Sequence, residues 1–545
     1  MTARSTTLPW WKRGVVYQIY PRSFMDADGD GIGDLQGIID RLDHLAALGV
    51  DAIWLSPIQP SPDADFGYDI SDYCDVHPNY GCLETFDALV AGCRERGLRV
   101  VLDGVFNHSS DKHAWFLESR QDRDNPKADW YLWRDGAGGR GPTGAPNNWA
   151  STFGGGGWEY VPEREQYFFH SFLKQQPDLN WRNPDVVDAV EAVLRFWMDR
   201  GVDGFRLDVF NAYLKHPDLP SNPRTWNPAG LLYPYIGQKH LHDRDQADMS
   251  IALEMMRRTV DEQPGRFLVG ETLDEDRRYR EAARYAGDDA DQLHLAFNFY
   301  LLRSRWSAEV FHKAITTWTA ALGPQGWPTW VLSNHDFPRH ASRWGGRWAD
   351  ARCRLAAIMA MTLRGTPFLY YGEEIGMAEH KLPRGLIQDP VGQRFWPIHR
   401  GRDGCRTPMQ WDAGPAAGFS TGEPWLPVHP DHATRNVAAQ QDDPSSVLST
   451  YKAIIALRKH LPVLQVGDMA LTESPHSAVL AYTRSLGDAR VQVLLNMSPK
   501  AQRWPIGGER KLLYGTHPER PVVLEGGEVT LAPHEGLVLG NEATL

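Results

Sequence analysis

The chain has 545 residues, of which 42% are hydrophobic and 23% charged, and its formal net charge is −12. This composition excludes global disorder, and the negative balance argues against nucleic acid as a partner, because nucleic-acid binding requires a basic face. No apolar window is long enough to span a membrane, no signal peptide is expected at the N-terminus, and five cysteines without a C-x-x-C spacing indicate reduced thiols in a cytoplasmic protein.

Short apolar runs alternate with amphipathic segments along most of the chain. We expect strands at 15–20, 52–55, 99–103, 204–207, 267–270, 293–297, 330–332 and 367–371, and helices at 38–48, 86–95 and 183–198 among the segments between them. Runs of Val, Ile and Leu without polar alternation suit strands that are buried on both faces. Eight such strands separated by helices predict an α/β fold, a closed parallel (β/α)8 TIM barrel. The rival is a doubly wound open sheet, but no Gly-rich phosphate turn follows the first strand.

Two long insertions and a tail depart from this alternation. Residues 104–175 contain a stretch dense in Gly, Pro and Asn and are expected to form a loop-rich inserted domain after the third strand. A second, subdomain-sized insertion is expected at about 375–445. Beyond residue 464 the helical periodicity stops, and alternating apolar positions predict a C-terminal antiparallel β domain at 465–545. The barrel itself would then comprise 1–103 and 176–464.

Acidic residues follow several of the predicted strands, at the end of a barrel where catalytic groups lie. The acids at four strand ends are Asp103, Asp208, Glu271 and Asp336, accompanied by His108, Arg206 and His335. Glycoside cleavage needs such a set, because one carboxylate attacks the anomeric carbon or activates water while a second carboxyl group protonates the leaving oxygen.

The spacing of these residues indicates different roles for two of the acids. Arg206 lies two residues before Asp208, so both side chains point to the same face of the strand. A guanidinium in that place keeps Asp208 ionised and suited to nucleophilic attack. Glu271, near other carboxylates in a partly dry pocket, is expected to have a raised pKa, which suits an acid/base.

A loop after the first strand has the composition of a cation site. Asp26-Ala-Asp-Gly-Asp-Gly-Ile-Gly-Asp34 presents acids at alternate positions with glycines for the turn. This pattern is similar to the first half of a calcium loop, although the terminal bidentate Glu of an EF-hand is missing. We expect a structural Ca²⁺ or Mg²⁺ here and no organic cofactor.

Ordered motifs across the barrel resemble a known family. Asp103-Gly-Val-Phe-Asn-His108, Gly204-Phe-Arg-Leu-Asp208, Gly270-Glu271 and Ser333-Asn-His-Asp336 resemble the four signature regions of the α-amylase family of glycoside hydrolases. Gln176-Pro-Asp-Leu-Asn180 and Gly365-Thr-Pro-Phe-Leu-Tyr-Tyr-Gly-Glu-Glu374 look like its two auxiliary motifs. Gly67-Tyr-Asp-Ile-Ser-Asp-Tyr73 and Arg402-Asp-Gly-Cys-Arg-Thr-Pro-Met-Gln-Trp411 are similar to its α-glucosidase and oligo-1,6-glucosidase branch.

The resemblance implies a retaining, exo-acting α-glucosidase that removes terminal glucose from short oligosaccharides through a covalent glucosyl-enzyme, with transglucosylation as a side activity. In this reading Asp208 is the nucleophile, Glu271 the acid/base and Asp336 the carboxylate that holds the sugar hydroxyls. Its implied substrate-binding residues are Tyr68, Asp69, His108, Arg206, His335 and Arg402, with Asp69 and Arg402 closing the far end of the pocket. Phe153 and Phe172 are candidate walls of the entrance. Its implied metal ligands are Asp26, Asp28, Asp30, Asp34 and the carbonyl of Ile32.

Two features of the expected activity stay open. Val209 directly follows the nucleophile, and in related enzymes Val is common there where α-1,6 bonds are preferred, whereas Ala or Thr accompanies α-1,4 bonds. The alternative function is a sucrose or trehalose isomerase or a glucosyltransferase, because these share every catalytic residue on the same scaffold. The segment 337–345 has arginines at 339 and 343 but no Asp, which weakens the sucrose isomerase reading. In either case the expected partner is a small oligosaccharide, with no nucleic acid and no membrane.

Overall fold

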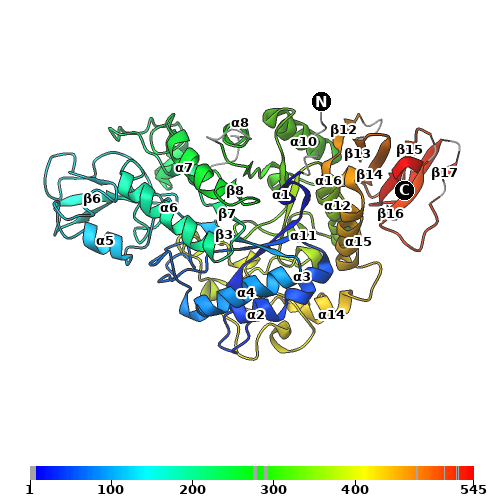
Figure 1. The fold of residues 1–545 in the computed structure, drawn as a ribbon, viewed down its shortest axis with the longest axis horizontal. Helices are drawn as coiled ribbons and strands as arrows, with labels where there is room; N and C mark the ends of the chain where they lie inside the picture. The colour runs from blue at the N-terminus through cyan, green and yellow to red at the C-terminus, as the bar shows by residue number, and fades with distance from the viewer. Residues whose placement is uncertain are drawn as a thin grey trace.

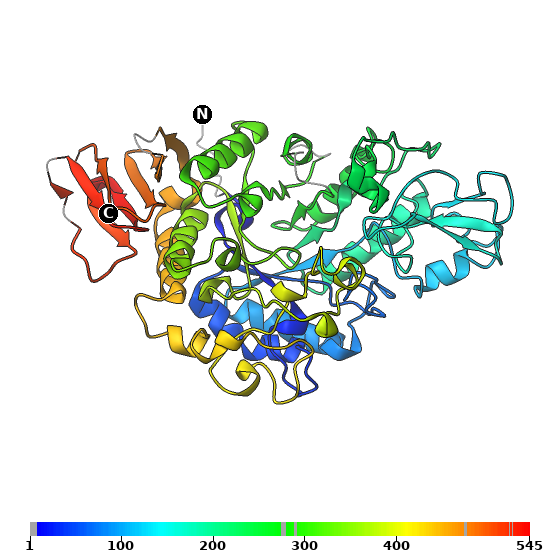
Figure 2. The same ribbon diagram turned by 180° about the vertical axis from the view of Figure 1, so that it is seen from behind.

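The structure is a computed structural model, and it describes residues 8–273, 279–287, 292–473, 477–508, 510–522, 524–525 and 527–544. Within these ranges no helix is both long and apolar enough to cross a lipid bilayer. A parallel sheet occupies the centre of the molecule, with smaller antiparallel sheets at the two ends of its long axis (Figures 1 and 2).

The central sheet is the predicted barrel. Its strands are β1 (Val16–Ile19), β2 (Ala52–Leu55), β3 (Arg99–Gly104), β7 (Gly204–Leu207), β8 (Phe267–Gly270), β9 (Leu295–Ala296), β10 (Thr329–Val331) and β11 (Thr366–Tyr370). They pair in parallel in the order β10-β11-β1-β2-β3-β7-β8-β9. The barrel is nearly closed, because the Thr329 hydroxyl of β10 donates a hydrogen bond of 2.7 Å to the Ala296 carbonyl of β9.

The helices surround this sheet (Figure 1). They are α1 (Trp10–Arg13), α2 (Leu35–Asp40), α3 (Leu42–Leu48), α4 (Leu83–Glu95), α5 (Ala114–Ser119), α6 (Pro184–Asp199), α7 (Ser250–Asp261), α8 (Tyr279–Arg284), α9 (Tyr300–Arg303), α10 (Ala308–Leu322), α11 (His340–Arg343), α12 (Ala349–Thr362), α13 (Pro390–Phe395), α14 (Val437–Gln440), α15 (Val447–His460) and α16 (Pro462–Val466). The single helix predicted at 38–48 is instead two helices, because the backbone of Arg41 leaves the helical region between α2 and α3. The Asn183 side chain caps α6 by accepting a hydrogen bond from Asp185 N.

The interior of the barrel is filled by apolar side chains, and charged side chains lie at the carboxyl ends of its strands. Val16, Trp54, Val101 and Phe368 belong to one buried cluster contributed by different strands. Bulky residues from several strands fill the interior, so the barrel is a packed core and not a channel. The residues that could do chemistry therefore lie above this core, at the strand ends.

Three smaller antiparallel sheets flank the barrel. One, ordered β4-β6-β5, follows β3 and comprises β4 (Trp133–Arg134), β5 (Trp158–Val161) and β6 (Gln166–Phe169). The other two lie near the C-terminus, in the orders β12-β13-β14-β19-β16 and β15-β18-β17. Their strands are β12 (Asp468–Thr472), β13 (Val479–Leu486), β14 (Ala489–Asn496), β15 (Gln502–Pro505), β16 (Lys511–Gly515), β17 (Leu524–Glu525), β18 (Glu528–Leu531) and β19 (Gly536–Gly540). The antiparallel pattern expected after the barrel is thus confirmed.

Candidate active site

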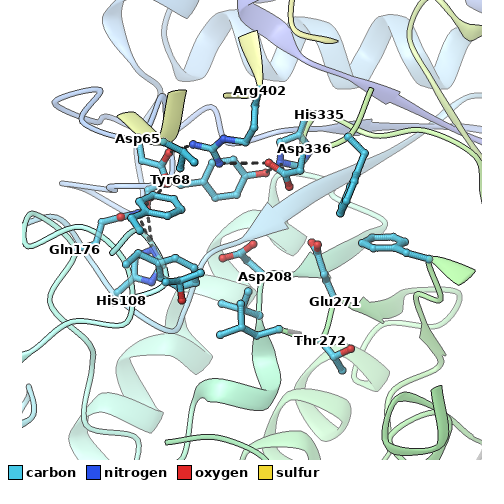
Figure 3. A pocket seen from close by; sticks show the side chains of 18 of the residues that line it. Asp65, Tyr68, His108, Gln176, Asp208, Glu271, Thr272, His335, Asp336 and Arg402 are labelled. Carbon is cyan, nitrogen blue, oxygen red and sulfur yellow. Dashed lines mark hydrogen bonds and ion pairs between the residues drawn. The ribbon is translucent and has the colours of Figure 1, made fainter. Parts of the chain in front are cut away.

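A cavity of about 350 Å³ lies at the carboxyl ends of the barrel strands (Figure 3). Asp208 follows β7 and Glu271 follows β8, and these strands are neighbours with Leu207 opposite Gly270. Two residues in equivalent register after adjacent parallel strands emerge side by side. The carboxyl groups of Asp208 and Glu271 accordingly both point into the cavity.

The guanidinium of Arg206 joins the carboxylates of three strands. Its side chain is 1% exposed, and Nη1 donates to Asp103 Oδ1 at 2.6 Å and to Asp208 Oδ1 at 2.8 Å. Nη2 contacts Glu271 Oε2. Because one planar group touches both Asp208 and Glu271, their carboxyl groups lie close together. Two carboxyl groups in one cavity are the set that glycoside cleavage requires.

Burial and charge act in opposite directions on Asp208. Burial raises its pKa to about 6, and the adjacent Arg206 limits this rise. The carboxylate is therefore still ionised at neutral pH, as a nucleophile requires. The sequence predicted the Arg206 contact but not the strength of the desolvation that it opposes.

Asp336 is held by a different set of groups, two arginines and a histidine. Arg406 Nη2 lies 3.1 Å and Arg402 Nη1 3.3 Å from its Oδ1, and His335 Nε2 lies 3.2 Å from its Oδ2. Burial favours the protonated acid, but His335, Arg402 and Arg406 outweigh it and hold the pKa of Asp336 well below its usual range. Since burial lowers the pKa of His335 to about 3, its ring is neutral at neutral pH, and the two arginines then supply the attraction.

One end of the cavity is closed by a buried ion-pair cluster. Arg402 Nη2 lies 2.6 Å from Asp65 Oδ1 and 2.6 Å from Asp389 Oδ1. Asp69, expected here, lies elsewhere: its carboxylate accepts hydrogen bonds from the Ser61 hydroxyl at 2.8 Å and from Asp65 N at 3.0 Å. Burial raises the pKa of Asp69 to about 6. In this loop the acid that pairs with Arg402 is thus Asp65, and Asp69 shapes the loop that carries Asp65.

The floor of the closed end is formed by rings. Tyr68 stacks on His335 with their centroids 5.4 Å apart, and its hydroxyl donates to Asp103 Oδ2 at 3.0 Å. His108 Nε2 lies 3.0 Å from the Tyr68 carbonyl. The parallel rings of Tyr68 and His335 therefore offer a flat face beside the acids, the arrangement needed to pack against a pyranose ring.

The two predicted entrance phenylalanines both line the cavity. Phe153 meets Phe172 edge to face at 5.6 Å, and the Arg402 guanidinium stands 5.3 Å above the Phe153 ring. Phe172 in turn contacts the His108 ring at 5.1 Å. The insertion after β3 thus contributes one wall of the cavity.

The open side of the cavity has another character. Its lining includes Val209, Tyr233, Phe299, Arg303 and Phe337. Val209 has φ 37° and ψ 39°, a left-handed conformation that is unusual for a β-branched residue and marks local strain. The Arg303 guanidinium packs 4.7 Å from the Phe337 ring. This side offers three aromatic rings and one cation to a second sugar.

Several residues of the site were missed by the sequence reasoning. Asp65 and Gln176 line the cavity, and Gln176 Nε2 bridges Asp65 Oδ2 at 3.3 Å and the Tyr68 carbonyl at 3.1 Å. Arg406, which holds Asp336, is fully buried. Gln176 and Arg406 lie inside the sequence motifs described above, and Asp65 lies two residues before one. Their closeness to these motifs was the signal that could have identified them.

The acidic loop after β1 brings three carboxylates together. Ligand oxygens of Asp26, Asp28 and Asp34 lie within 4.8 Å of one another. Asp30 is not in this group, and its Oδ1 accepts a hydrogen bond from Ile32 N at 2.7 Å. Burial raises the pKa of Asp34, and repulsion from Asp28 and Asp26 adds to the rise although two backbone N–H groups oppose it. Crowded oxygens with this repulsion fit a hard divalent cation.

Comparison with known proteins agrees with this geometry. Residues 18–467 match the family model for the alpha-amylase catalytic domain. The chain is 46% identical to a probable alpha-glucosidase of Rhizobium meliloti, over 90% of both chains. It is 39% identical to an oligo-1,6-glucosidase of Parageobacillus thermoglucosidasius, over 90% of this chain and 91% of that one. The crystal structure of an alpha-glucosyl transfer enzyme matches with a TM-score of 0.91 and 41% identity, covering 98% of this chain and all of that one. The trehalulose synthase of Pseudomonas mesoacidophila matches with a TM-score of 0.87 and 34% identity, covering 98% and 99%.

Proposed function

The chain belongs to the α-amylase family and is a glycoside hydrolase of the α-glucosidase and oligo-1,6-glucosidase kind, and from this premise we propose that it releases single α-glucose units from the non-reducing ends of short oligosaccharides with retention of configuration. The observation that carries the proposal is the contact of Arg206 with both Asp208 and Glu271 in a cavity whose far end is closed by Arg402 and Asp65.

In the first step Asp208 attacks the anomeric carbon as the bond to the glycosidic oxygen breaks, and Glu271 gives its proton to that oxygen. Asp208 then carries the glucosyl group as an ester. In the second step Glu271 takes a proton from water, the water oxygen bonds to the anomeric carbon, and the ester bond breaks. Two displacements at one carbon restore the α configuration.

The glucose would lie at the closed end. Asp336, kept ionised by Arg402 and Arg406, would accept hydrogen bonds from two sugar hydroxyls, and Tyr68 would pack against the sugar face. The Arg402–Asp65 pair would stand in the path of a chain that continued beyond the glucose. This supports exo action.

Short substrates are favoured by a contact over the opening. The Tyr233 hydroxyl donates to the Thr152 carbonyl, joining the loop after β7 to the insertion after β3, and the Tyr233 ring meets Phe395 edge to face at 5.4 Å. Tyr233 and Thr152 line the cavity, whereas Phe395 lies behind Tyr233 and does not. A wall bridged in this way limits the number of sugars on the leaving-group side.

The test is a trisaccharide labelled at its reducing end. Exo cleavage from the non-reducing end yields unlabelled glucose and a labelled disaccharide as the first products. Labelled glucose as the first product, or labelled disaccharide without free glucose, would contradict the proposal.

A second candidate is glucosyl transfer, including sucrose isomerisation, on the same residues. It is favoured by the likeness to an alpha-glucosyl transfer enzyme and to a trehalulose synthase, and by the aromatic open side formed by Phe299, Phe337 and Tyr233. We propose transfer as a side activity. On sucrose, glucose and fructose in equal amounts indicate hydrolysis, whereas isomers of sucrose as the main product would make transfer the principal reaction.

We also propose that Asp26, Asp28 and Asp34 hold a divalent cation, with Asp30 and the Ile32 carbonyl as further candidate ligands. The ion would neutralise the repulsion among these acids and stabilise the turn before α2, whose N-terminus is capped by Asp34 through Gly37 N at 2.6 Å. The loop is separate from the cavity, so the role is structural.

A further inference from the structure

We propose that Asn211 is a positioning residue that fixes the acid/base Glu271 relative to the nucleophile Asp208. The inference rests on the roles proposed above for these two carboxyl groups. Within the described residues, the hydrogen bond of 2.9 Å from Glu271 N to the Leu207 carbonyl is the last one of the parallel ladder between β7 and β8. Beyond it, other contacts must hold Glu271 in place.

The turn after the nucleophile supplies the first of these contacts. Val209 takes its left-handed conformation directly after Asp208, and the chain then enters a short 3-10 helix at Phe210–Ala212. The turn directs Phe210 N to the Glu271 carbonyl at 3.2 Å. The conformation of Val209 thus allows the backbone after the nucleophile to bond to the backbone of the acid/base. Local strain of this kind persists where the surrounding structure fixes it.

The Asn211 side chain supplies the second contact, with Leu273, which lies two residues beyond Glu271. Its Oδ1 accepts a hydrogen bond from Leu273 N at 2.7 Å, and its Nδ2 donates to the Leu273 carbonyl at 3.4 Å. Because Leu273 N is a donor, the atom facing it must be the amide oxygen, which fixes the orientation of the side chain. The amide therefore pairs with both polar groups of one peptide residue.

The Asn211 side chain is itself held from behind. It is 1% exposed, its Nδ2 also reaches Asp245 Oδ1 at 3.2 Å, and Asp245 N donates to the Asn211 carbonyl at 2.7 Å. Asn211 is not among the described residues that line the cavity. Its side chain therefore acts on the reaction through the residues that it holds, among them the segment 271–273.

Together these contacts hold the segment 271–273 against the turn 208–211 at two points on either side of Thr272. Proton donation by Glu271 depends on its distance from the glycosidic oxygen, and a displacement of about 1 Å can cost about 10²-fold in rate. Loss of the Asn211 amide should therefore impair the proton transfer by Glu271 more than the attack by Asp208.

The test compares two substrates in Asn211→Ala and in Asn211→Asp, which keeps the size of the side chain and the acceptor for Leu273 N. Maltose or isomaltose has a poor leaving group that needs protonation, whereas 2,4-dinitrophenyl α-glucoside has one that leaves without it. Values of kcat/KM report the first step. We expect Asn211→Ala to lose about 100-fold on the disaccharide and less than about tenfold on the aryl glucoside, and Asn211→Asp, whose second carboxylate oxygen would face Asp245 Oδ1, to show the same preference. Azide, which attacks without a general base, should raise the kcat of both variants on the aryl glucoside.

Two reference variants make the result decisive. Asn496→Ala removes a buried amide that bonds to the Lys500 and Ala532 carbonyls in the C-terminal sheet, and it should change both substrates equally and show no azide effect. Glu271→Gln should show the same leaving-group preference in stronger form. Equal losses on both substrates in the Asn211 variants, with the preference present in Glu271→Gln, would overturn the role of Asn211 alone. If Glu271→Gln lacks the preference, the acid/base assignment itself fails.

Discussion

The two acidic clusters of this molecule relieve like-charge repulsion in different ways. In the cavity Asp103, Asp208 and Glu271 surround Arg206. In the loop after β1 the carboxylates of Asp26 and Asp34 accept hydrogen bonds from uncharged donors within the described residues, namely backbone N–H groups and the Ser420 hydroxyl.

The presence or absence of an internal cation determines the function for which each cluster is suited. Carboxylates that share a fixed internal cation stay ionised while an oxygen remains open to the cavity, as a nucleophile requires. Carboxylates without such an internal cation place their oxygens around a point that a bound metal ion can occupy. Matched substitutions in the two clusters should therefore have separate consequences, one for rate and the other for stability.

The largest effect is expected for Asp208→Asn. The amide cannot form the glucosyl ester, so kcat/KM should fall by about 10⁴-fold or more while the melting temperature stays near that of the unmodified protein. The matched change in the other cluster, Asp26→Asn, should instead lower the melting temperature and leave kcat/KM within a few-fold. Steady-state kinetics and thermal melts of both variants check this, and near-normal turnover of Asp208→Asn would refute its role.

The next effect separates the two acids of the loop 65–69. Asp65→Asn weakens the pair that holds Arg402 at the closed end, so kcat/KM should fall about 10- to 100-fold. Asp69→Asn should leave kcat/KM within a few-fold, because that carboxylate faces Ser61 and the backbone of its own loop. Kinetics on one disaccharide measure both, and the reverse ranking would show that Asp69 serves the glucose.

The pH dependence follows from Asp208. Its pKa in the free enzyme is raised to about 6, and only the ionised form attacks, so kcat/KM should fall about tenfold per pH unit below 6. Asp336 should not contribute to this limb, because its pKa is held well below the usual range. A pH profile of kcat/KM measures the limb, and full activity at pH 4 would contradict it.

A smaller effect is expected at Val209. A branched apolar side chain next to the nucleophile crowds an α-1,4-linked second ring more than an α-1,6-linked one, so the unmodified protein should cleave isomaltose. Val209→Ala removes the γ-methyl groups beside the nucleophile, and we expect its maltose-to-isomaltose ratio to rise about ten- to a hundredfold, since one methyl-sized contact is worth about 1–3 kcal/mol. An unchanged ratio would place linkage choice elsewhere.

The smallest effect is that of the cation. An ion bound only by the folded state at about 100 times its Kd adds roughly 2.7 kcal/mol, which for a chain of this size corresponds to about 2–3 °C. A chelator should lower the melting temperature by that amount and Ca²⁺ or Mg²⁺ should restore it, but not in Asp28→Ala. A melting curve that the chelator leaves unmoved would make the loop an acidic turn only.

The regular parts of the molecule were predictable from the sequence and the loops were less so. Strand periodicity placed Asp208 and Glu271 at neighbouring strand ends, because side-chain direction in a strand follows from position alone. No such rule applies to the loop where Asp65 and Asp69 both stand, and backbone turns there decide which one faces Arg402; Asp63 and Phe66 in this loop have positive φ. The same limit applies to Asp30, whose side chain caps its own turn, and to Asn211, whose partner lies 62 residues away.

The configuration of the first product tests the central claim most directly. Early-time NMR on maltose or isomaltose resolves the anomers of newly released glucose before they interconvert. Two successive displacements, with Asp208 as nucleophile and Glu271 as acid and then base, predict that glucose appears first as the α anomer. Initial release of β-glucose would mean a single displacement by water and would contradict the account.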